Sequence, residues 1–383
     1  MITRLNVGGP ARQVAYLHQA FNEGHDYKSV LIHGSLDTGE GDFSSLIQNK
    51  SDVIYISQIV RPISIINDLI ALIKLMKVID KEDVDLIHSH TAKAGLLSRL
   101  AVICLNSLRR LRGKKRIMLM HTYHGHVFAG YFDAFKTKMI KKIESFLWRR
   151  TDAIAVLTES QQKEICSYLN VSSNKSHIVP LGLDLRKFLD VEKNESMNEK
   201  FACHAKVWVG WVGRLCAIKN PMRFLEIVSS LVNRTELDHV NFVIVGGGDL
   251  EPEIKNSIVD LNLEKRVYLY GWSDELPKVY SGIDMFFNTS DNEGTPVAVL
   301  ESVASGVPVA ATNVGGTFEV LKGRDKCWVF DKENWASEID AWSEFLKSPA
   351  KIAFASRDKT VEDFSCETLK NNLQDIYQSI ANP

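Results

Sequence analysis

Short apolar stretches alternate with longer amphipathic stretches along the first half of the chain. Ile- and Val-rich runs separated by segments of helical periodicity predict strands and helices in turn. The start, MITRLNVGGPARQVAYLHQAF, is typical of a strand end, a glycine turn and a helix, and its strand is so short that the natural start could lie upstream of Met1. The predicted strands are residues 1–3, 53–56, 85–89, 116–120, 153–157 and 178–181, and the predicted helices are 63–81, 91–108, 134–150 and 160–169.

The same alternation restarts after the polar segment EKNESMNEK (192–200), whose composition is typical of an exposed linker. Two such series predict an α/β fold with two Rossmann-like, doubly wound parallel sheets. We assign residues 1–184 to the first domain and residues 185–362 to the second. In the second series the predicted strands are 207–212, 241–245, 267–270, 283–287 and 327–330, and the predicted helices are 221–233, 251–261, 335–346 and 367–380.

The stretch 288–316, NTSDNEGTPVAVLESVASGVPVAATNVGG, carries the clearest chemical signal. Thr295 is a suitable N-cap for a helix that ends at Gly306, a residue that tolerates the left-handed C′ conformation. Glu293 lies in the loop before this helix, and Glu301 lies eight positions later as the only charge within it. Carboxylates beyond the carboxyl end of an apolar strand face the crevice in which open α/β sheets bind ligands. An ordinary loop acid and a solvated helical glutamate are the alternative.

Two cations and two glycines indicate a phosphate site. VGRLCAIKNP places Arg214 at the end of a strand and Lys219 at the start of the next helix, five positions later. Cations at a helix amino terminus oppose the helix dipole, so this placement costs stability unless an anion lies between them. Gly8 and Gly9 form a strand-to-helix turn whose exposed amides could face a diphosphate. The alternatives are two surface cations and a simple tight turn.

Neither the histidines nor the apparent D-x-D motif predicts a metal site. His121, His124 and His126 in HTYHGHVFAGYF have no acidic or cysteine partner at ligand spacing. Asp83 and Asp85 open a predicted strand, at the end opposite the ligand crevice, whereas a metal-binding D-x-D closes one. We therefore expect no divalent-metal requirement.

These motifs resemble the retaining glycosyltransferases of the two-Rossmann-domain (GT-B) type, specifically the glycosyl transferases group 1 of family 4 with their E-x7-E element. The resemblance implies two domains that face each other across a cleft, with residues 363–383 forming a helix that packs back on the first domain. It also implies that Glu293, beside the amides of Gly294 and Thr295, contacts the donor sugar, and that Glu301 binds the nucleotide ribose. A carboxylate suits both tasks because it accepts strong hydrogen bonds from hydroxyl groups.

Other roles also follow from the resemblance. Arg214 and Lys219 match an R-x4-K pair that holds the donor diphosphate and stabilises the leaving group, and the Gly8–Gly9 loop approaches the same phosphate. His124 matches an active-site histidine near the reacting carbon. The turn VGGGDLEPEI borders the nucleotide, the segment GWSDELP from Gly271 borders the base, and the acceptor side is lined by His126, Tyr131 and Phe132.

Charge is distributed unevenly along the chain. Residues 1–190 contain 26 Lys and Arg and 18 Asp and Glu, a balance of +8, whereas residues 191–383 contain 20 and 29, a balance of −9. Such a basic half suits an anionic membrane surface or a phosphate-bearing acceptor, and the chain has no aromatic-interleaved basic motif for nucleic acid. The candidate membrane contacts are residues 109–116 (RRLRGKKR) and the basic amphipathic segment 136–150, for which a core-facing stripe is the alternative.

The remaining composition bounds localisation. The six cysteines are scattered without metal or disulfide spacing, which fits a reducing cytosol. No signal peptide and no apolar run of spanning length is recognised. We expect a cytoplasmic protein, peripheral at the inner face of the plasma membrane.

The expected function is a metal-independent hexosyltransferase without a cofactor. It would move a hexose-type sugar from a nucleotide sugar, with UDP preferred, to a lipid-linked or polysaccharide acceptor in lipopolysaccharide or capsule biosynthesis. Two alternatives fit the same architecture. A nucleotide-sugar epimerase would convert the donor without an acceptor, and a sugar-nucleotide-binding subunit would bind it without turnover.

Overall fold

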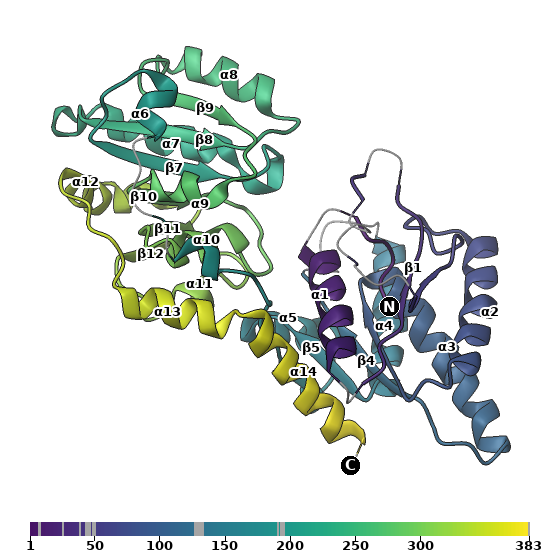
Figure 1. Cartoon of the computed structure of the whole chain (residues 1–383). Helices are drawn as coiled ribbons and strands as arrows, with labels where there is room; N and C mark the ends of the chain where they lie inside the picture. Colours follow the sequence, from purple (N-terminus) through teal and green to yellow (C-terminus); the bar gives the residue numbers. More distant parts are fainter. Residues whose placement is uncertain are drawn as a thin grey trace. The chain divides into compact units, whose positions relative to one another are not determined.

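The computed structural model describes residues 1–6, 9–24, 27–37, 40–42, 47, 51–125, 134–189, 191 and 196–381. The chain divides into two compact units (Figure 1). Unit 1 comprises Met1–Leu183 and Cys366–Pro383, and unit 2 comprises Asp184–Ser365. The sequence placed the corresponding boundaries after residues 184 and 362.

Unit 1 contains parallel strands that run in chain order across the sheet. The four-stranded sheet has the order β3-β4-β5-β6, and β1 and β2 form a separate pair. Ile2 bridges in parallel to His90 of β3, and its amide donates to the Ile32 carbonyl of β1, so the first residues lie between the two sheets. The strands are β1 (Leu31–His33), β2 (Val53–Tyr55), β3 (Leu86–His90), β4 (Met118–Thr122), β5 (Ala153–Val156) and β6 (Ser176–Ile178).

Helices cover both faces of the unit 1 sheet. On one face α2, α3, α4 and α5 pack successively against one another, and on the other α1 packs against α14. Neighbouring residues of β4 separate the two cores, because Leu119 belongs to the cluster under α2 and α3, whereas Met120 belongs to the cluster under α1 and α14. The helices are α1 (Gly9–Glu23), α2 (Ile65–Lys81), α3 (Ala92–Leu111), α4 (Ala134–Arg150), α5 (Glu159–Leu169) and α14 (Cys366–Ala381).

The last helix, α14, belongs to unit 1 although it is the end of the chain. It buries Leu369, Leu373 and Ile376 in the cluster that includes Phe21 of α1. A side chain at Gly182 would lie 2.8 Å from Leu369, so this close approach requires glycine. The apolar face of α14 thus completes the core of unit 1.

Unit 2 is a six-stranded parallel sheet of order β12-β11-β10-β7-β8-β9. The strand order reverses between β10 and β7, and such a switch point opens a crevice at the carboxyl ends of the two strands. The strands are β7 (Val207–Val212), β8 (Val240–Val245), β9 (Val267–Gly271), β10 (Met285–Asn288), β11 (Val309–Thr312) and β12 (Cys327–Phe330). The main helices are α7 (Pro221–Val232), α8 (Glu251–Asp260), α9 (Leu276–Ser281), α10 (Val297–Ala304), α12 (Ile339–Lys347) and α13 (Phe354–Asp363).

Several short elements differ from the sequence prediction. The polar segment 192–200 is only partly loop, because α6 (Ser196–Phe201) begins inside it. Met197 is buried there, and the Asn198 side chain accepts from the Trp208 indole at 3.0 Å, so two contacts outweigh the polar composition. Residues 192–195 lie outside the described residues. The prediction also missed β1, α11 (Thr317–Leu321) and α13, which are short or have weak periodicity.

Candidate active site

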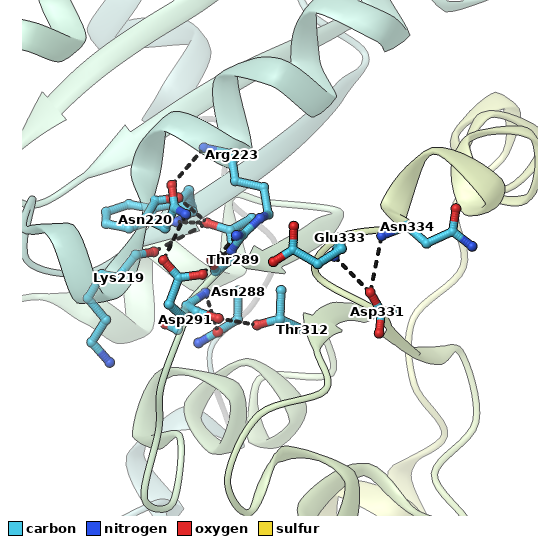
Figure 2. Close-up of polar contacts among 12 residues, drawn as sticks. Lys219, Asn220, Arg223, Asn288, Thr289, Asp291, Thr312, Asp331, Glu333 and Asn334 are labelled. Atoms are coloured by element: carbon cyan, nitrogen blue, oxygen red, sulfur yellow. Dashed lines mark hydrogen bonds and ion pairs between the residues drawn. The ribbon is translucent and has the colours of Figure 1, made fainter. Parts of the chain in front are cut away.

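The crevice of unit 2 is built by the loops that follow β7 and β10. Arg223 joins them, donating to the Asp291 carboxylate at 2.7 Å and to the Thr289 carbonyl at 2.7 Å. The Asn220 side chain donates to the other Asp291 oxygen at 2.9 Å, and its own carbonyl oxygen caps α7. Figure 2 shows Asn220 and Arg223 directed toward Asp291, with the Lys219 side chain extending away from them. Sequence reasoning missed this clamp because its three polar residues have no distinctive spacing.

Lys219 and Glu293 meet across the crevice. The Lys219 ammonium lies 2.6 Å from Glu293 Oε1, and the same oxygen accepts from Ser290 at 2.7 Å and from the Asn288 amide at 3.3 Å. Glu293 is 8% exposed, so this carboxylate is buried and charge-paired. The sequence predicted an anion between Arg214 and Lys219. For Lys219 that anion is the Glu293 carboxylate of the protein itself.

Arg214 is different from Lys219. It begins the loop after β7 and is exposed. Its guanidinium makes no ion pair or hydrogen bond with any residue that the structure describes. An exposed cation beside a helix amino terminus is available to an anionic ligand.

Helix α10 begins later than the sequence predicted. Pro296, not Thr295, occupies the N-cap position, and the helix starts at Val297. The Thr295 hydroxyl is buried and finds no hydrogen-bond partner among the described residues, which leaves it free for a ligand. The end of the helix is confirmed, because Gly306 adopts φ +76° and its amide donates to the Val303 carbonyl.

Glu301 lies inside α10, as predicted, and is half-buried. Its carboxylate accepts from the Tyr280 hydroxyl at 3.3 Å, and that hydroxyl also donates to the Ala298 carbonyl at 3.0 Å. Burial and the neighbouring Glu301 charge raise the pKa of Tyr280 well above its ordinary value. Tyr280 is thus a permanent donor that orients Glu301.

Glycines allow the crevice loops to approach closely. Gly315 has φ +54°, and a side chain there would lie 1.7 Å from the Glu293 carbonyl oxygen. The turn VGGGD packs in the same way, because a side chain at Gly246 would lie 1.9 Å from the carbonyl oxygen of Gly213, beside Arg214. Gly271, at the end of β9, has φ +79° and open space around it.

Unit 1 gathers histidines at the carboxyl ends of β3 and β4. His90 Nδ1 lies 2.9 Å from His124 Nε2, while His124 Nδ1 is buried and without a partner among the described residues. His88 bridges the Tyr377 hydroxyl at 2.6 Å and the Thr122 hydroxyl at 2.7 Å. Burial lowers the pKa of His124 to about 4, and burial also holds the pKa values of His88 and His90 well below their ordinary value. The cluster is therefore neutral.

A buried ion pair supports the histidines. Arg99 is fully buried and contacts both carboxylate oxygens of Glu144 at 2.9 Å, and the Tyr123 hydroxyl donates to the same carboxylate at 2.8 Å. A side chain at Gly95 would lie 2.4 Å from the His121 ring, so α3 and β4 are in close contact. A small cavity adjoins this network, lined by Thr91, Ala92, His121, Thr122, Tyr123, His124 and Glu144.

The structure also locates the remaining candidates. Gly9 begins α1 and is exposed, whereas Gly8, His126, Tyr131 and Phe132 lie outside the described residues. Asp83 forms an ion pair with Arg109 at 3.2 Å, and Asp85 directly precedes β3, which confirms that the apparent D-x-D opens a strand.

Three general properties complete the description of the site. Within the described ranges, no three His, Cys, Asp or Glu side chains gather as a metal site requires. All six cysteines are free. No helix in the described part of the chain is long and apolar enough to cross a membrane.

Two parallel-sheet units, one with a ligand crevice at a strand switch point, have the architecture of the GT-B fold. HepE of Anabaena in complex with UDP superimposes with a TM-score of 0.77 and 17% identity, over 99% of this chain and 98% of that chain. A glycosyltransferase from Rickettsia africae superimposes with a TM-score of 0.77 and 18% identity, over 100% of this chain and 97% of that chain. The lipopolysaccharide outer core galactosyltransferase WaaB superimposes with a TM-score of 0.73 and 15% identity, over 99% of this chain and 98% of that chain.

Sequence comparison identifies the family. Residues 7–187 match the model "Glycosyltransferase Family 4", and residues 206–347 match "Glycosyl transferases group 1". The chain belongs to family 4 of the glycosyltransferases. The "UDP-Gal:alpha-D-GlcNAc-diphosphoundecaprenol alpha-1,3-galactosyltransferase" of Escherichia coli is 29% identical, over 88% of this chain and 86% of that protein. The capsular polysaccharide biosynthesis glycosyltransferase CapM of Staphylococcus aureus is 22% identical, over 88% of each.

Proposed function

We propose that this glycosyltransferase transfers a hexose from a UDP-sugar to a lipid-linked or polysaccharide acceptor, with retention of the anomeric configuration and without a metal ion. The acceptor would belong to a capsule or lipopolysaccharide pathway at the cytosolic face of the membrane. Support comes from the UDP complex of HepE and from the Escherichia coli relative, whose name specifies a UDP-galactose donor and a diphosphoundecaprenol acceptor.

The pairing of Lys219 with Glu293 at the switch point of unit 2 carries this proposal. When the donor binds, Lys219 and the unpaired Arg214 contact the diphosphate, and their charge replaces that of a metal ion. Glu293 then orients the sugar through its hydroxyls, beside the unpartnered Thr295 hydroxyl. Glu301 holds the ribose, and His124 of unit 1 contacts the sugar.

Retention would proceed by attack from the face that the diphosphate leaves. The bond between the anomeric carbon and the phosphate oxygen breaks, the acceptor oxygen bonds to that carbon, and a diphosphate oxygen takes the acceptor proton. Three donors to Oε1 of Glu293 withdraw charge from the carboxylate and lower its nucleophilicity, which disfavours the double-displacement alternative. Isolation of a covalent glycosyl-enzyme would contradict this mechanism, and the anomeric configuration of the product, measured by NMR, tests retention.

The test of the donor site is thermal unfolding with UDP, GDP, ADP and NAD. UDP at 100 times its dissociation constant should stabilise the wild type by about 2.7 kcal/mol, a shift of a few degrees. Lys219→Ala should lose the shift, whereas Lys206→Ala, which removes an exposed lysine of the same unit, should keep it. A shift with NAD alone, or one untouched by Lys219→Ala, would overturn the assignment.

Turnover separates transfer from the other activities of this architecture. A transferase releases UDP and glycosylated acceptor in equal amounts, and EDTA should leave its rate unchanged. Conversion of the donor without an acceptor would identify an epimerase. Tight UDP binding without turnover on a panel of lipid-linked and glycan acceptors would identify a binding subunit.

A further inference from the structure

Helix α2 and the residue pair before it present six aliphatic side chains to solvent. Five belong to the first half of the helix and one precedes it, and they are 39 to 74% exposed. We define this surface as the aliphatic face, formed by Ile63, Ile65, Ile66, Leu69, Ile70 and Ile73. Single exposed aliphatic residues are ordinary, but a contiguous group of this size marks an interaction site.

The aliphatic face is not the side of α2 that packs on the protein. Ala71, Leu75 and Ile79 fill that role, and all three are fully buried against α3 and the sheet. Helix α2 therefore has an apolar buried side and, over its first half, an apolar outer side as well. A contiguous apolar surface on the outer side of a helix that is already packed on its other side favours a second apolar environment.

Exposed lysines border one end of the aliphatic face, and unit 1 is rich in cations beyond it. Lys74, Lys77 and Lys81 continue the same exposed side of α2 toward its carboxyl end. Across α2, α3, the loop 112–116 and α4 the sequence contains seventeen Lys and Arg and only three carboxylates. Each of the three is in an ion pair within unit 1, with Lys93, Arg112 and Arg99 as the respective partners of Asp68, Asp80 and Glu144.

The aliphatic face lies near the histidine cluster. Lys93 at the start of α3 donates to the Pro62 carbonyl at 2.9 Å and pairs with Asp68 of α2 at 2.6 Å, so the amino-terminal ends of the two helices are joined. Thr91, two residues before Lys93, lines the cavity that contains His124. An apolar phase that covered the aliphatic face would lie beside the candidate active site of unit 1.

We infer that the aliphatic face of α2 inserts into an anionic lipid bilayer and holds the active-site edge of unit 1 against it. The inference rests on the proposed transfer to a lipid-linked acceptor, which a bilayer at this edge would present. Amphipathic surfaces of this kind bind by burying apolar side chains at the headgroup boundary while cations contact anionic lipids. The α4 surface has the same character, since Met139, Ile143 and Phe146 are exposed beside Lys138 and Lys142.

The surrounding charge argues against a second copy of the chain as the occupant. Two copies that joined through the aliphatic face would bring their lysine-rich borders together, and like charges facing each other oppose association. An anionic bilayer satisfies the apolar face and the cations at once.

Vesicle flotation tests this inference on the full chain. The probe is a phosphatidylcholine vesicle with one third phosphatidylglycerol, compared with pure phosphatidylcholine. The triple variant Ile66→Gln, Leu69→Gln, Ile73→Gln removes half of the aliphatic face, and Gln preserves helix propensity. The matched control is Val259→Gln, Leu261→Gln, Phe354→Gln, which removes three exposed apolar side chains of unit 2.

The wild type and the control should float with the anionic vesicles, and more weakly with vesicles that lack phosphatidylglycerol. The vesicle partition coefficient of the α2 variant should be lower by about tenfold or more. Equal partitioning of the wild type and the α2 variant would overturn the inference, as would failure of the wild type to float. A dimer in light scattering that the α2 variant converts to a monomer would instead show a subunit interface.

The UDP thermal shift of the same variants keeps the two proposals separate. The α2 variant should retain the shift, which also shows that it is folded. Flotation without any UDP shift would refute the proposed function but support the membrane surface. A UDP shift without flotation would support the proposed donor site but refute the membrane surface.

Discussion

Both units place polar side chains at the carboxyl ends of parallel strands, but those of unit 1 are neutral and those of unit 2 are charged. Unit 1 gathers neutral imidazoles, because burial lowers the pKa of His88, His90, His121 and His124. Unit 2 gathers charges, and its Glu293 carboxylate is held by Lys219 at 2.6 Å. One α/β scaffold therefore supports two kinds of site, set by which side chains the strand ends carry.

Each site suits a different chemical group of the nucleotide sugar in the proposed function. Charged donors suit a diphosphate, because charge-assisted hydrogen bonds are stronger than neutral ones. Neutral imidazoles suit hydroxyl groups, because they donate or accept hydrogen bonds without adding charge to a buried site. The charged site of unit 2 thus suits a diphosphate, and the neutral site of unit 1 suits hydroxyl groups.

The largest expected effect is on the charged half. Glu293→Gln should lower the transfer rate about 1000-fold, close to 4 kcal/mol of transition-state stabilisation, because the amide cannot offset Lys219 or accept at both atoms. Initial rates at saturating UDP-sugar measure the loss. Glu264→Gln, an exposed residue of the same unit, should retain the wild-type rate. A loss below tenfold would show that Glu293 is structural.

A second change removes the only buried ion pair described beneath the histidine cluster. Arg99→Met should lower the free energy of unfolding by about 3 kcal/mol, because it leaves the Glu144 charge buried without its partner. Urea unfolding measures the loss. The double variant Arg99→Met, Glu144→Leu should recover at least half of it, since no uncompensated charge remains. A double variant as unstable as the single one would mean that packing around Arg99 dominates.

Acid should destabilise unit 1 more than unit 2. The unfolded chain protonates His124 below about pH 6.5, whereas burial keeps the folded residue neutral down to its pKa of about 4. The contribution of His124 to the free energy of unfolding is therefore fully present above about pH 6.5. It falls by up to about 1.4 kcal/mol per pH unit as the pH drops toward 4. His88, His90 and His121 act in the same direction.

Amide hydrogen exchange measures this difference within one molecule. Between about pH 7 and pH 5, protection of β3 and β4 should fall relative to β7 and β8 after correction for intrinsic exchange. His124→Gln should reduce the fall. Equal loss of protection in both units would contradict the assignment of the acid sensitivity to the histidine cluster.

The smallest expected effect concerns His90. Its contact with His124 requires one proton between two neutral rings, so His90 is a positioning residue that fixes the His124 tautomer. His90→Ala should lower kcat/KM about fivefold and mix the His124 tautomers in nitrogen-15 NMR spectra. His90→Asn keeps a polar atom near the Nδ1 position and should rescue both. A single unchanged tautomer in His90→Ala would refute the positioning role.

Much of the fold could be predicted from the sequence. Strand β7 and helix α4 have the predicted limits because each is a patterned run between clear turn signals, and the four-residue strand β12 was located because all its residues are apolar and charged residues flank it. Shorter elements such as β1 and α11 were missed, since three to five residues carry too little periodicity. The N-cap is Pro296, one residue after the predicted Thr295, which is within the usual spread of helix boundaries.

The candidate site was predicted as residues but not as contacts. The sequence indicated that Arg214 ends a strand, that Glu293 lies in a loop, and that Lys219 and Glu301 belong to the helices that follow. It did not indicate that Lys219 would pair with Glu293, or that Arg223 would clamp the two loops together. His88 and His90 in the run HSH were visible, but only the pairing of β3 with β4 brings them to His121 and His124.

The sequence by itself determined the class of this protein, because hydrophobic periodicity is a local property that each segment carries, and two series of it specify two parallel sheets. Tertiary structure alone decided which charges are neutralised and which surfaces stay open. Glu144 looked like part of a basic amphipathic helix and is a buried partner of Arg99. The outer side of α2 carries aliphatic residues and is nevertheless exposed. Periodicity says how apolar a helix is, but only packing decides which of its sides finds a partner.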